Sequence, residues 1–474
     1  MEEPFGNSRR KLKSFLFLTF LLFLLYISNL RVIASSDTIP NRILPVNIVI
    51  KKSLYLDSWG PAYLHGGGSM GPYFFAESRG HLVSAYPIIM PVMLSPLYIG
   101  PCWWLQNEPR SLRPLATDLV VDTMEKLSAA LIAALSVGLL FLALLKVASF
   151  ECSLLVSAIC GVASETWAVS SQGLWRQGFA ELAFAFLLWA LVRSPQARWY
   201  GFLVGLAIAL ATANNQLYGI VALVFLVCFA LRQRHQLEMF ILPIAVLVGL
   251  SLAYNYYFVG NLLGHRFTNL AAKGPWANTH DLSHPLWQGV LGQLISPSRG
   301  LLIYMPWTLF SLWGGLRLWR ASTSFWHRYL LVSTLGVYFI RAKFSGWWGG
   351  WCYGPRYLTD VLPILAFLLV PIWPVLRSSR LMRIAMGTAV AVAVGIQVLG
   401  AFQYSIGVWD STPNNIDDHQ ERLWDWKNTQ IVSCWKGGMR GSELDKRWGY
   451  YFGVKGELAR RGLIPARGSS PAPR

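Results

Sequence analysis

The sequence predicts an all-α polytopic membrane protein with about eleven transmembrane helices. The first observation is composition, because 54% of the 474 residues are hydrophobic and only 14% are charged, a balance far more apolar than that of soluble domains. The second is that long apolar runs alternate with short basic clusters, as in the cytoplasmic ends of membrane spans. The net charge of +18 therefore indicates a lipid bilayer as partner and no nucleic acid.

The first apolar run covers residues 14–30 and follows Arg9, Arg10, Lys11 and Lys13. A signal peptide begins in the same way, but no clear A-x-A-like cleavage site follows. We therefore predict an uncleaved first transmembrane helix with the N-terminus in the cytoplasm.

Ten later runs are apolar over most of a bilayer thickness. They cover 127–147, 153–170, 179–193, 199–212, 216–231, 239–258, 300–316, 326–342, 359–376 and 384–406. Residues 199–231 are uncharged but contain "TANNQ", and as one helix they would measure about 50 Å against a hydrocarbon core of about 30 Å. Two helices with a polar turn between them fit that segment better.

Residues 83–104 are long enough to cross the bilayer but contain four prolines, each of which removes a helix hydrogen bond. If this segment does not cross, the later arginine clusters all fall on the side of the basic N-terminus, as the positive-inside rule requires. We therefore expect a re-entrant or interfacial segment within one long external loop, about 31–126. The transmembrane domain then covers 1–406, and 407–474 form a short external tail with a disordered end.

The six cysteines form no C-x-x-C pair and no cluster with histidines. Three of them lie in strongly apolar stretches, where a thiol behaves as a small hydrophobic group. A pair among Cys102, Cys352 and Cys434 stays possible. Because the histidines at 65, 81 and 265 are scattered, the sequence offers no obvious metal site.

Asp37 lies within about two turns of the end of the first predicted span. In one interpretation the carboxylate caps the backbone amides of the following "TIP" in an Asx-type turn. In the other it is a general base at the lip of an apolar cavity, taking a proton from a sugar hydroxyl while a lipid phosphate leaves. Arg42 either holds this carboxylate ionised, binds phosphate, or is a solvated surface cation.

The long first loop is rich in Trp, Tyr, Gly and Pro, a composition typical both of bilayer interfaces and of surfaces that stack on sugar rings. It offers acceptor-binding or auxiliary candidates, to which we add one tyrosine from the 343–358 loop. These candidates are Asp57, Trp59, His65, Glu77, His81, Tyr86 and Tyr357.

Two arginines stand where predicted external loops re-enter the bilayer, Arg299 in "SPSRGLLIYMPW" and Arg356 in "GGWCYGPRYLTDVLP". A guanidinium fork suits a phosphate diester, so both are candidates for binding the phosphate of a lipid donor. Snorkelling or salt bridging is the alternative. Glu165 and Glu181 lie in or near predicted spans, where an acid is either functional or paired with Arg176.

These pieces, in their order along residues 14–400, resemble the GT-C superfamily of polytopic glycosyltransferases, which includes protein O-mannosyltransferases and aminoarabinose transferases of lipid A. More narrowly, "SSDTIPNRILPVNIV", "RGHLVSAYPIIMPVMLSPLY", "SSQGLWRQGFAEL" and the two arginine motifs are similar, in the same order, to stretches in uncharacterised bacterial members. This similarity implies a bacterial-type plasma (inner) membrane as the location of the chain. The resemblance implies an inverting transfer of a sugar from a polyprenyl-phosphate donor to a hydroxyl of a glycan, lipid or protein acceptor, with Asp37 as base. The lipid-linked sugar is then a co-substrate, and no further cofactor is expected.

The family often has an acidic pair in this loop, whereas here Thr38 follows Asp37 and the next acid is Asp57; whether Asp37 acts alone is left open. A transporter or flippase of a lipid-linked or polar solute is the competing hypothesis, because broken spans and intramembrane prolines are also transporter features. A catalytically inactive relative is the third. The tail either docks on the external face or is solvated.

Overall fold

The computed structural model describes residues 6–64, 73–264, 282–321 and 324–464, and these are mostly helical. The predicted all-α character is confirmed. Four helical segments are long and apolar enough to cross a membrane, 113–144, 234–259, 356–378 and 380–403, and three shorter apolar helices accompany them. The chain is therefore a membrane-associated protein by the length and composition of its helices.

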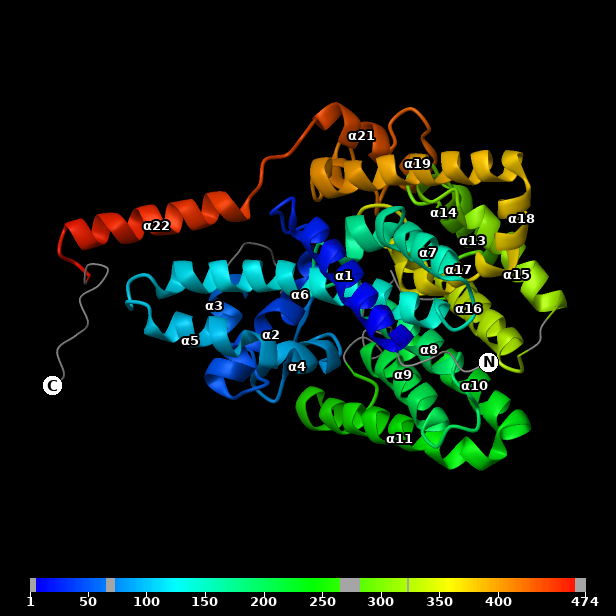
Figure 1. Ribbon diagram of the computed structural model, residues 1–474. Helices are drawn as coiled ribbons and strands as arrows, with labels where there is room; N and C mark the ends of the chain where they lie inside the picture. Colours follow the sequence, from blue (N-terminus) through cyan, green and yellow to red (C-terminus); the bar gives the residue numbers. More distant parts are fainter. Residues whose placement is uncertain (1–5, 65–72, 265–281, 322–323, 465–474) are drawn as a thin grey trace.

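The N-terminal part comprises a first helix, a group of short helices and a long helix beside them (Figure 1). Its elements are α1 (Gly6–Ile27), α2 (Ile39–Lys51), α3 (Gly60–Leu64), β1 (Phe75–Ser78), β2 (His81–Ser84), α4 (Ile89–Leu94), α5 (Ile99–Asn107) and α6 (Arg113–Leu144). Helices α2 to α5 lie against the first half of α6 and form one hydrophobic cluster with it. The second half of α6 enters the main helix bundle.

The main bundle is built around α8, which contacts α6, α9 and the turn at 356–361 and is buried along most of its length. Helix α8 covers Arg176–Leu191, and the other helices of the bundle are α7 (Phe150–Val162), α9 (Tyr200–Asn214), α10 (Gly219–Arg232), α11 (Leu237–Tyr254), α13 (Leu286–Ile295), α14 (Leu301–Tyr304), α15 (Thr308–Arg320), α16 (His327–Ala342), α17 (Leu362–Phe367), α18 (Trp373–Ser378) and α19 (Arg380–Gln403). After α19 follow α20 (Val408–Ser411), α21 (Gln430–Gly437) and α22 (Leu444–Arg460).

Several predicted spans are interrupted at residues that disfavour helix. The chain breaks at "TANNQ" between α9 and α10, as predicted, with Asn215 extended and capping the next turn. The run 300–316 divides into α14 and α15 at Met305 and Pro306, and 359–376 contains three prolines and divides into α17, a 3-10 turn and α18. Each break follows from a missing amide hydrogen or from a polar residue that competes for backbone bonds.

The segment 83–104 contains the end of β2 and then enters a helical stretch, in which the six-residue α4, a 3-10 turn and the nine-residue α5 follow one another without a gap. This stretch, 89–107, is not among the described segments that are long and apolar enough to cross a membrane. Helix α6 begins at Arg113, so residues 113–126 of the predicted loop are helical.

A small hairpin was not predicted. Strands β1 and β2 pair antiparallel through a two-residue turn at Arg79 and Gly80, both with positive φ, as a type I′ turn requires. The strand Phe75–Ser78 buries all but its third residue. Because the hairpin is only four residues a side, its alternation was too short to distinguish from a loop.

All six cysteines are buried and free. The pair considered among Cys102, Cys352 and Cys434 is therefore not formed. Burial raises the pKa of the Cys102 thiol to about 11 and that of Cys434 to about 12, so both remain protonated near neutral pH and behave as small hydrophobic groups.

The tail docks on the rest of the molecule. The amides of residues 443 and 444 donate to the carbonyl of Leu30, and Lys455 binds the carboxylate of Glu108 with 2.7 Å contacts. Helix α22 consequently lies along α6 (Figure 1). The predicted disordered end begins near 460, and residues 465–474 lie outside the described part of the chain.

Candidate functional site

Asp37 sits in a tight turn between α1 and α2. Ser35 caps this turn, because its hydroxyl accepts the Asp37 amide at 3.2 Å, and Pro40 then starts α2 with a preset φ. Ser35 therefore supplies the cap that one interpretation of the sequence attributed to Asp37, and the Asp37 carboxylate contacts distant segments of the chain.

The Asp37 carboxylate is bound on both oxygens. Its Oδ2 pairs with Nη1 of Arg356 at 2.9 Å, and its Oδ1 accepts hydrogen bonds from the hydroxyls of Tyr86 at 2.6 Å and Tyr73 at 2.9 Å. The side chain of Asp37 remains 19% exposed, against 7% for Arg356. The carboxylate is thus mostly desolvated yet still open to a small molecule.

The loop 343–358 holds Arg356 by its shape. Gly354 has a φ of +53°, and a Cβ there would lie 2.2 Å from the Glu165 carboxylate, so only glycine fits the turn. The Arg356 guanidinium lies over the ring of Trp175 at 4.3 Å and donates to the carbonyl of Gly349. Within the described residues its buried Nε has no hydrogen-bond partner, so part of the hydrogen-bonding capacity of this guanidinium is unused.

Two further arginines, Arg176 and Arg341, contact the tyrosines next to the Asp37–Arg356 ion pair. Arg176 stacks over the ring of Tyr86 at 4.6 Å. Arg341 lies 5.4 Å from the ring of Tyr357, donates to Tyr218 and pairs with Asp360 at 2.5 Å.

The guanidinium groups of Arg356, Arg341 and Arg176 thus stand near the carboxylates of Asp37 and Asp360. In a low-dielectric surrounding a guanidinium attracts an anion strongly.

The hydroxyl of Tyr73 donates a hydrogen bond to the Asp37 carboxylate. Loss of water around its hydroxyl, and next the charge of Asp37, raise the pKa of Tyr73 well above its ordinary value. The hydroxyl therefore stays protonated and remains a hydrogen-bond donor to Asp37 across neutral pH.

Arg299 is placed differently from the role predicted for it. Its five N–H donors are all used, by the carbonyls of 298, 348 and 350, by the Gln430 amide oxygen and by Asp410 at 2.8 Å. The side chain is 1% exposed. Because no donor is left for a phosphate, this geometry gives Arg299 a structural position and does not support phosphate binding.

Arg42 is also engaged, and not by Asp37. Its guanidinium pairs with Asp122 at 2.9 Å and Glu125 at 3.2 Å. A cleft of about 320 Å³ lies beside the Asp37 turn. Its wall includes Ser36, Arg42, Asp122 and, from the tail, Arg447. The wall of this cleft carries charged and hydroxyl groups. A phosphate that binds Arg42, as predicted, would have to compete with the carboxylates of Asp122 and Glu125.

The outer candidates of the first loop gather away from Asp37. Asp57 accepts from the Leu82 amide and pairs with His81 at 2.8 Å, and both side chains are about half exposed. Trp59 packs on the hydrophobic cluster of α2 to α6, and Glu77 is exposed on β1. His65 lies outside the described residues, as does His265.

Tyr86 and Tyr357 do belong to the site. Tyr86 binds Asp37 directly, and Tyr357 lies between two guanidinium groups, 5.7 Å from Arg356 and 5.4 Å from Arg341. The structure therefore brings together Asp37, Tyr86, Arg356 and Tyr357 among the predicted residues.

Sequence reasoning missed Tyr73, Arg341 and Gln430, and named Arg176 only as a possible partner of an acid. The side chain of Gln430 links the tail to the loop, since it accepts from the Gly354 amide and donates to the Cys352 carbonyl. The available signal for Arg341 was its charge at the end of an apolar run. No local pattern marks Gln430.

Glu165 and Glu181, the two acids in or near predicted spans, are both fully buried. Glu181 accepts from the hydroxyls of Thr166 and Ser170, each at 2.6 Å. Glu165 lies against Gly354, and within the described residues its carboxylate oxygens have no hydrogen-bond partner.

No group of three or more His, Cys, Asp or Glu side chains is placed to hold a metal ion in the described ranges. Comparisons with protein-family models, with curated proteins and with solved structures found no match. The interpretation of the site consequently rests on its own chemistry.

Proposed function

We propose that this chain is a membrane glycosyltransferase that moves a sugar from a polyprenyl-phosphate donor to an acceptor hydroxyl, as its resemblance to the GT-C superfamily implies. The observation that carries the proposal is the contact between Asp37 and Arg356, which are 319 residues apart in the sequence and meet in a partly exposed site. A base and an anion-binding group side by side are what such a transfer needs.

In this proposal the lipid phosphate binds Arg356, with Arg341 and Arg176 adding positive charge. The acceptor hydroxyl gives its proton to Asp37, and its oxygen forms the new bond to the anomeric carbon. The bond from that carbon to the phosphate oxygen breaks, and polyprenyl phosphate leaves with the electron pair. Attack opposite the leaving group inverts the anomeric centre.

The donor phosphate has a second effect on Asp37. In the structure Arg356 holds the carboxylate, so a phosphate that takes over the guanidinium would weaken that ion pair and make the carboxylate a better proton acceptor. The cleft of about 320 Å³ lined by Ser36, Arg42 and Asp122 adjoins the same turn, and we assign it to a polar glycan, lipid or protein acceptor.

The proposal includes about eleven membrane spans in an inner membrane, with the N-terminus in the cytoplasm and the site on the external face. The charge pattern of α1 supports it, since Arg9, Arg10, Lys11 and Lys13 lie in its first two turns and Asp37 follows its other end.

The test is the release of free polyprenyl phosphate from a panel of polyprenyl-phosphate sugars, by purified protein in detergent with candidate acceptors. We expect Asp37→Asn to lower turnover at least about 100-fold, as loss of a general base does. The matched control is Asp57→Asn, which changes a carboxylate of the same loop that lies outside the charged site. Unfolding midpoints of all three proteins check that the variants are folded.

Turnover that survives in Asp37→Asn but fails in Asp57→Asn would move the base to Asp57. Substrate that crosses a vesicle membrane with its sugar bond intact would instead favour the transporter hypothesis. Absence of both activities would favour an inactive relative.

A further inference from the structure

A second cavity lies at the opposite end of the bundle from Asp37. It has a volume of about 560 Å³ and is lined by residues at 147, 191–195, 318, 324–327 and 367–371. Helix α8 separates the two sites, because Arg176 at its start is near Asp37 and Leu191 at its end lines the cavity. Its 16 residues correspond to about 24 Å at 1.5 Å per residue, so the cavity is a separate site.

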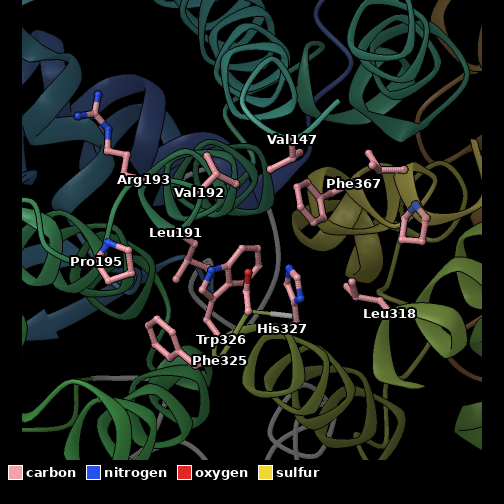
Figure 2. Close-up of a pocket in the computed structure, with 13 residues that line it drawn as sticks. Val147, Leu191, Val192, Arg193, Pro195, Leu318, Phe325, Trp326, His327 and Phe367 are labelled. Atoms are coloured by element: carbon pink, nitrogen blue, oxygen red, sulfur yellow. The ribbon is translucent and has the colours of Figure 1, made fainter. Parts of the chain in front are cut away.

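The wall of this cavity is mainly apolar and aromatic. Figure 2 shows the rings of Phe325, Trp326 and Phe367 and the aliphatic side chains of Leu191 and Val192 around the same space. A cavity of this volume is in the range that holds a drug-sized molecule or part of a lipid chain. The wall therefore suits an apolar ligand or the apolar part of a larger one.

His327 gives the cavity a polar point. The residue is 8% exposed, lines the cavity, and its Nδ1 has no hydrogen-bond partner within the described residues. The ring lies edge-on to Trp326, with 4.2 Å between centroids, and Figure 2 shows it among the lining side chains. A buried polar atom left without a partner costs free energy, and a ligand that accepts a hydrogen bond would recover it.

The charge around the opening is positive. Arg193 lines the cavity at its edge, over the ring of Trp189, and Arg317 and Arg328 directly adjoin the lining residues Leu318 and His327 in sequence. None of the lining residues in the described part of the chain is acidic. An apolar cavity with a hydrogen-bond donor and a cationic edge is complementary to a lipid phosphate and its acyl chain.

We propose that this cavity binds an anionic membrane phospholipid, with an acyl chain against the aromatic wall and the phosphate between Arg193 and His327. The Nδ1–H tautomer of His327 donates to a phosphate oxygen, and Arg193 swings from Trp189 to neutralise the charge. The site does not depend on the glycosyltransferase proposal, because no residue of the Asp37 site takes part.

The test uses delipidated full-length protein in a neutral detergent, titrated with dioleoyl phosphatidylglycerol or dioleoyl phosphatidylcholine. Native mass spectrometry measures the bound lipid, and the unfolding midpoint reports its effect on stability. We expect phosphatidylglycerol to bind about tenfold more tightly than phosphatidylcholine and to raise the midpoint.

Three variants locate the site. Arg193→Gln and His327→Phe are each expected to weaken phosphatidylglycerol binding about fivefold. Arg198→Gln, an exposed arginine near the same end that stacks on Trp199 and does not line the cavity, is the matched control and should bind as the wild type does. If His327→Phe fails to fold, the comparison of Arg193→Gln with Arg198→Gln still decides.

Equal affinity for the two phospholipids, or equal losses in Arg193→Gln and Arg198→Gln, would overturn the proposal. Polyprenyl phosphate that displaces phosphatidylglycerol at equimolar concentration would overturn the choice of phospholipid and identify the cavity as a second polyprenyl-phosphate site.

Discussion

Two arginine–aspartate pairs in this protein have nearly the same length and different positions. Arg299 and Asp410 are 2.8 Å apart and their side chains are 1% and 0% exposed, whereas Arg356 and Asp37 are 2.9 Å apart and 7% and 19% exposed. All donors of Arg299 are used within the protein, but Arg356 keeps an Nε without a partner among the described residues. An ion pair therefore indicates a candidate site only where some of its hydrogen-bonding capacity remains for a ligand.

The strongest way to test this comparison is to remove the buried partner. Arg299→Met should lower the free energy of unfolding by about 3–5 kcal/mol, because it leaves Asp410 charged and buried without its partner. Urea unfolding in detergent, followed by tryptophan fluorescence, measures the loss. A variant as stable as the wild type would contradict the structural position of Arg299.

Arg356→Gln should lower activity strongly and stability only slightly. We expect release of polyprenyl phosphate to fall about 100-fold, since the donor phosphate loses its main cation, while the free energy of unfolding falls by only about 1–2 kcal/mol. The same two assays measure both quantities. Full activity in a folded Arg356→Gln protein would remove Arg356 from the proposed site.

The smallest effects are expected from the two tyrosines that donate hydrogen bonds to Asp37. Tyr86 is 2% exposed and Tyr73 is 42% exposed, so loss of the Tyr86 hydrogen bond should cost more. We expect Tyr86→Phe to destabilise the protein by about 1.5–3 kcal/mol and Tyr73→Phe by less than about 1 kcal/mol. Thermal unfolding of the pair checks the order, and a larger loss in Tyr73→Phe would be the contrary result.

The sequence predicted the helical class and many of the breaks, because prolines and "TANNQ" are local signals. It missed the first 14 residues of α6, since Arg113, Asp118, Asp122 and Glu125 make that stretch too polar for a span. The structure explains the helix by long-range contacts, with Arg42 and Arg447 both bound to Asp122. Tertiary pairing of this kind is not encoded in any local window.

For the site, residue type pointed to Asp37 and Arg356 separately but could not show that they meet. Arg299 and Arg356 looked alike in sequence because both follow a loop and precede an apolar run. Asp410 and Gln430, which use donors of Arg299, lie more than a hundred residues beyond it in the chain. The structure was therefore needed to show that the donors of Arg299 are all used, whereas Arg356 keeps an Nε without a partner among the described residues.

The contacts of Gln430 imply that the turn presenting Arg356 is completed late, after the main bundle has been synthesised. The loop at 352–354 and Arg299 are both bound by this one tail side chain, which the ribosome adds after every helix of the main bundle. As chains fold from the N-terminus while they are made, the turn that presents Arg356 reaches its final form only when the tail docks. A nascent chain lacking the tail would therefore hold its membrane helices and Asp37 but an incomplete site.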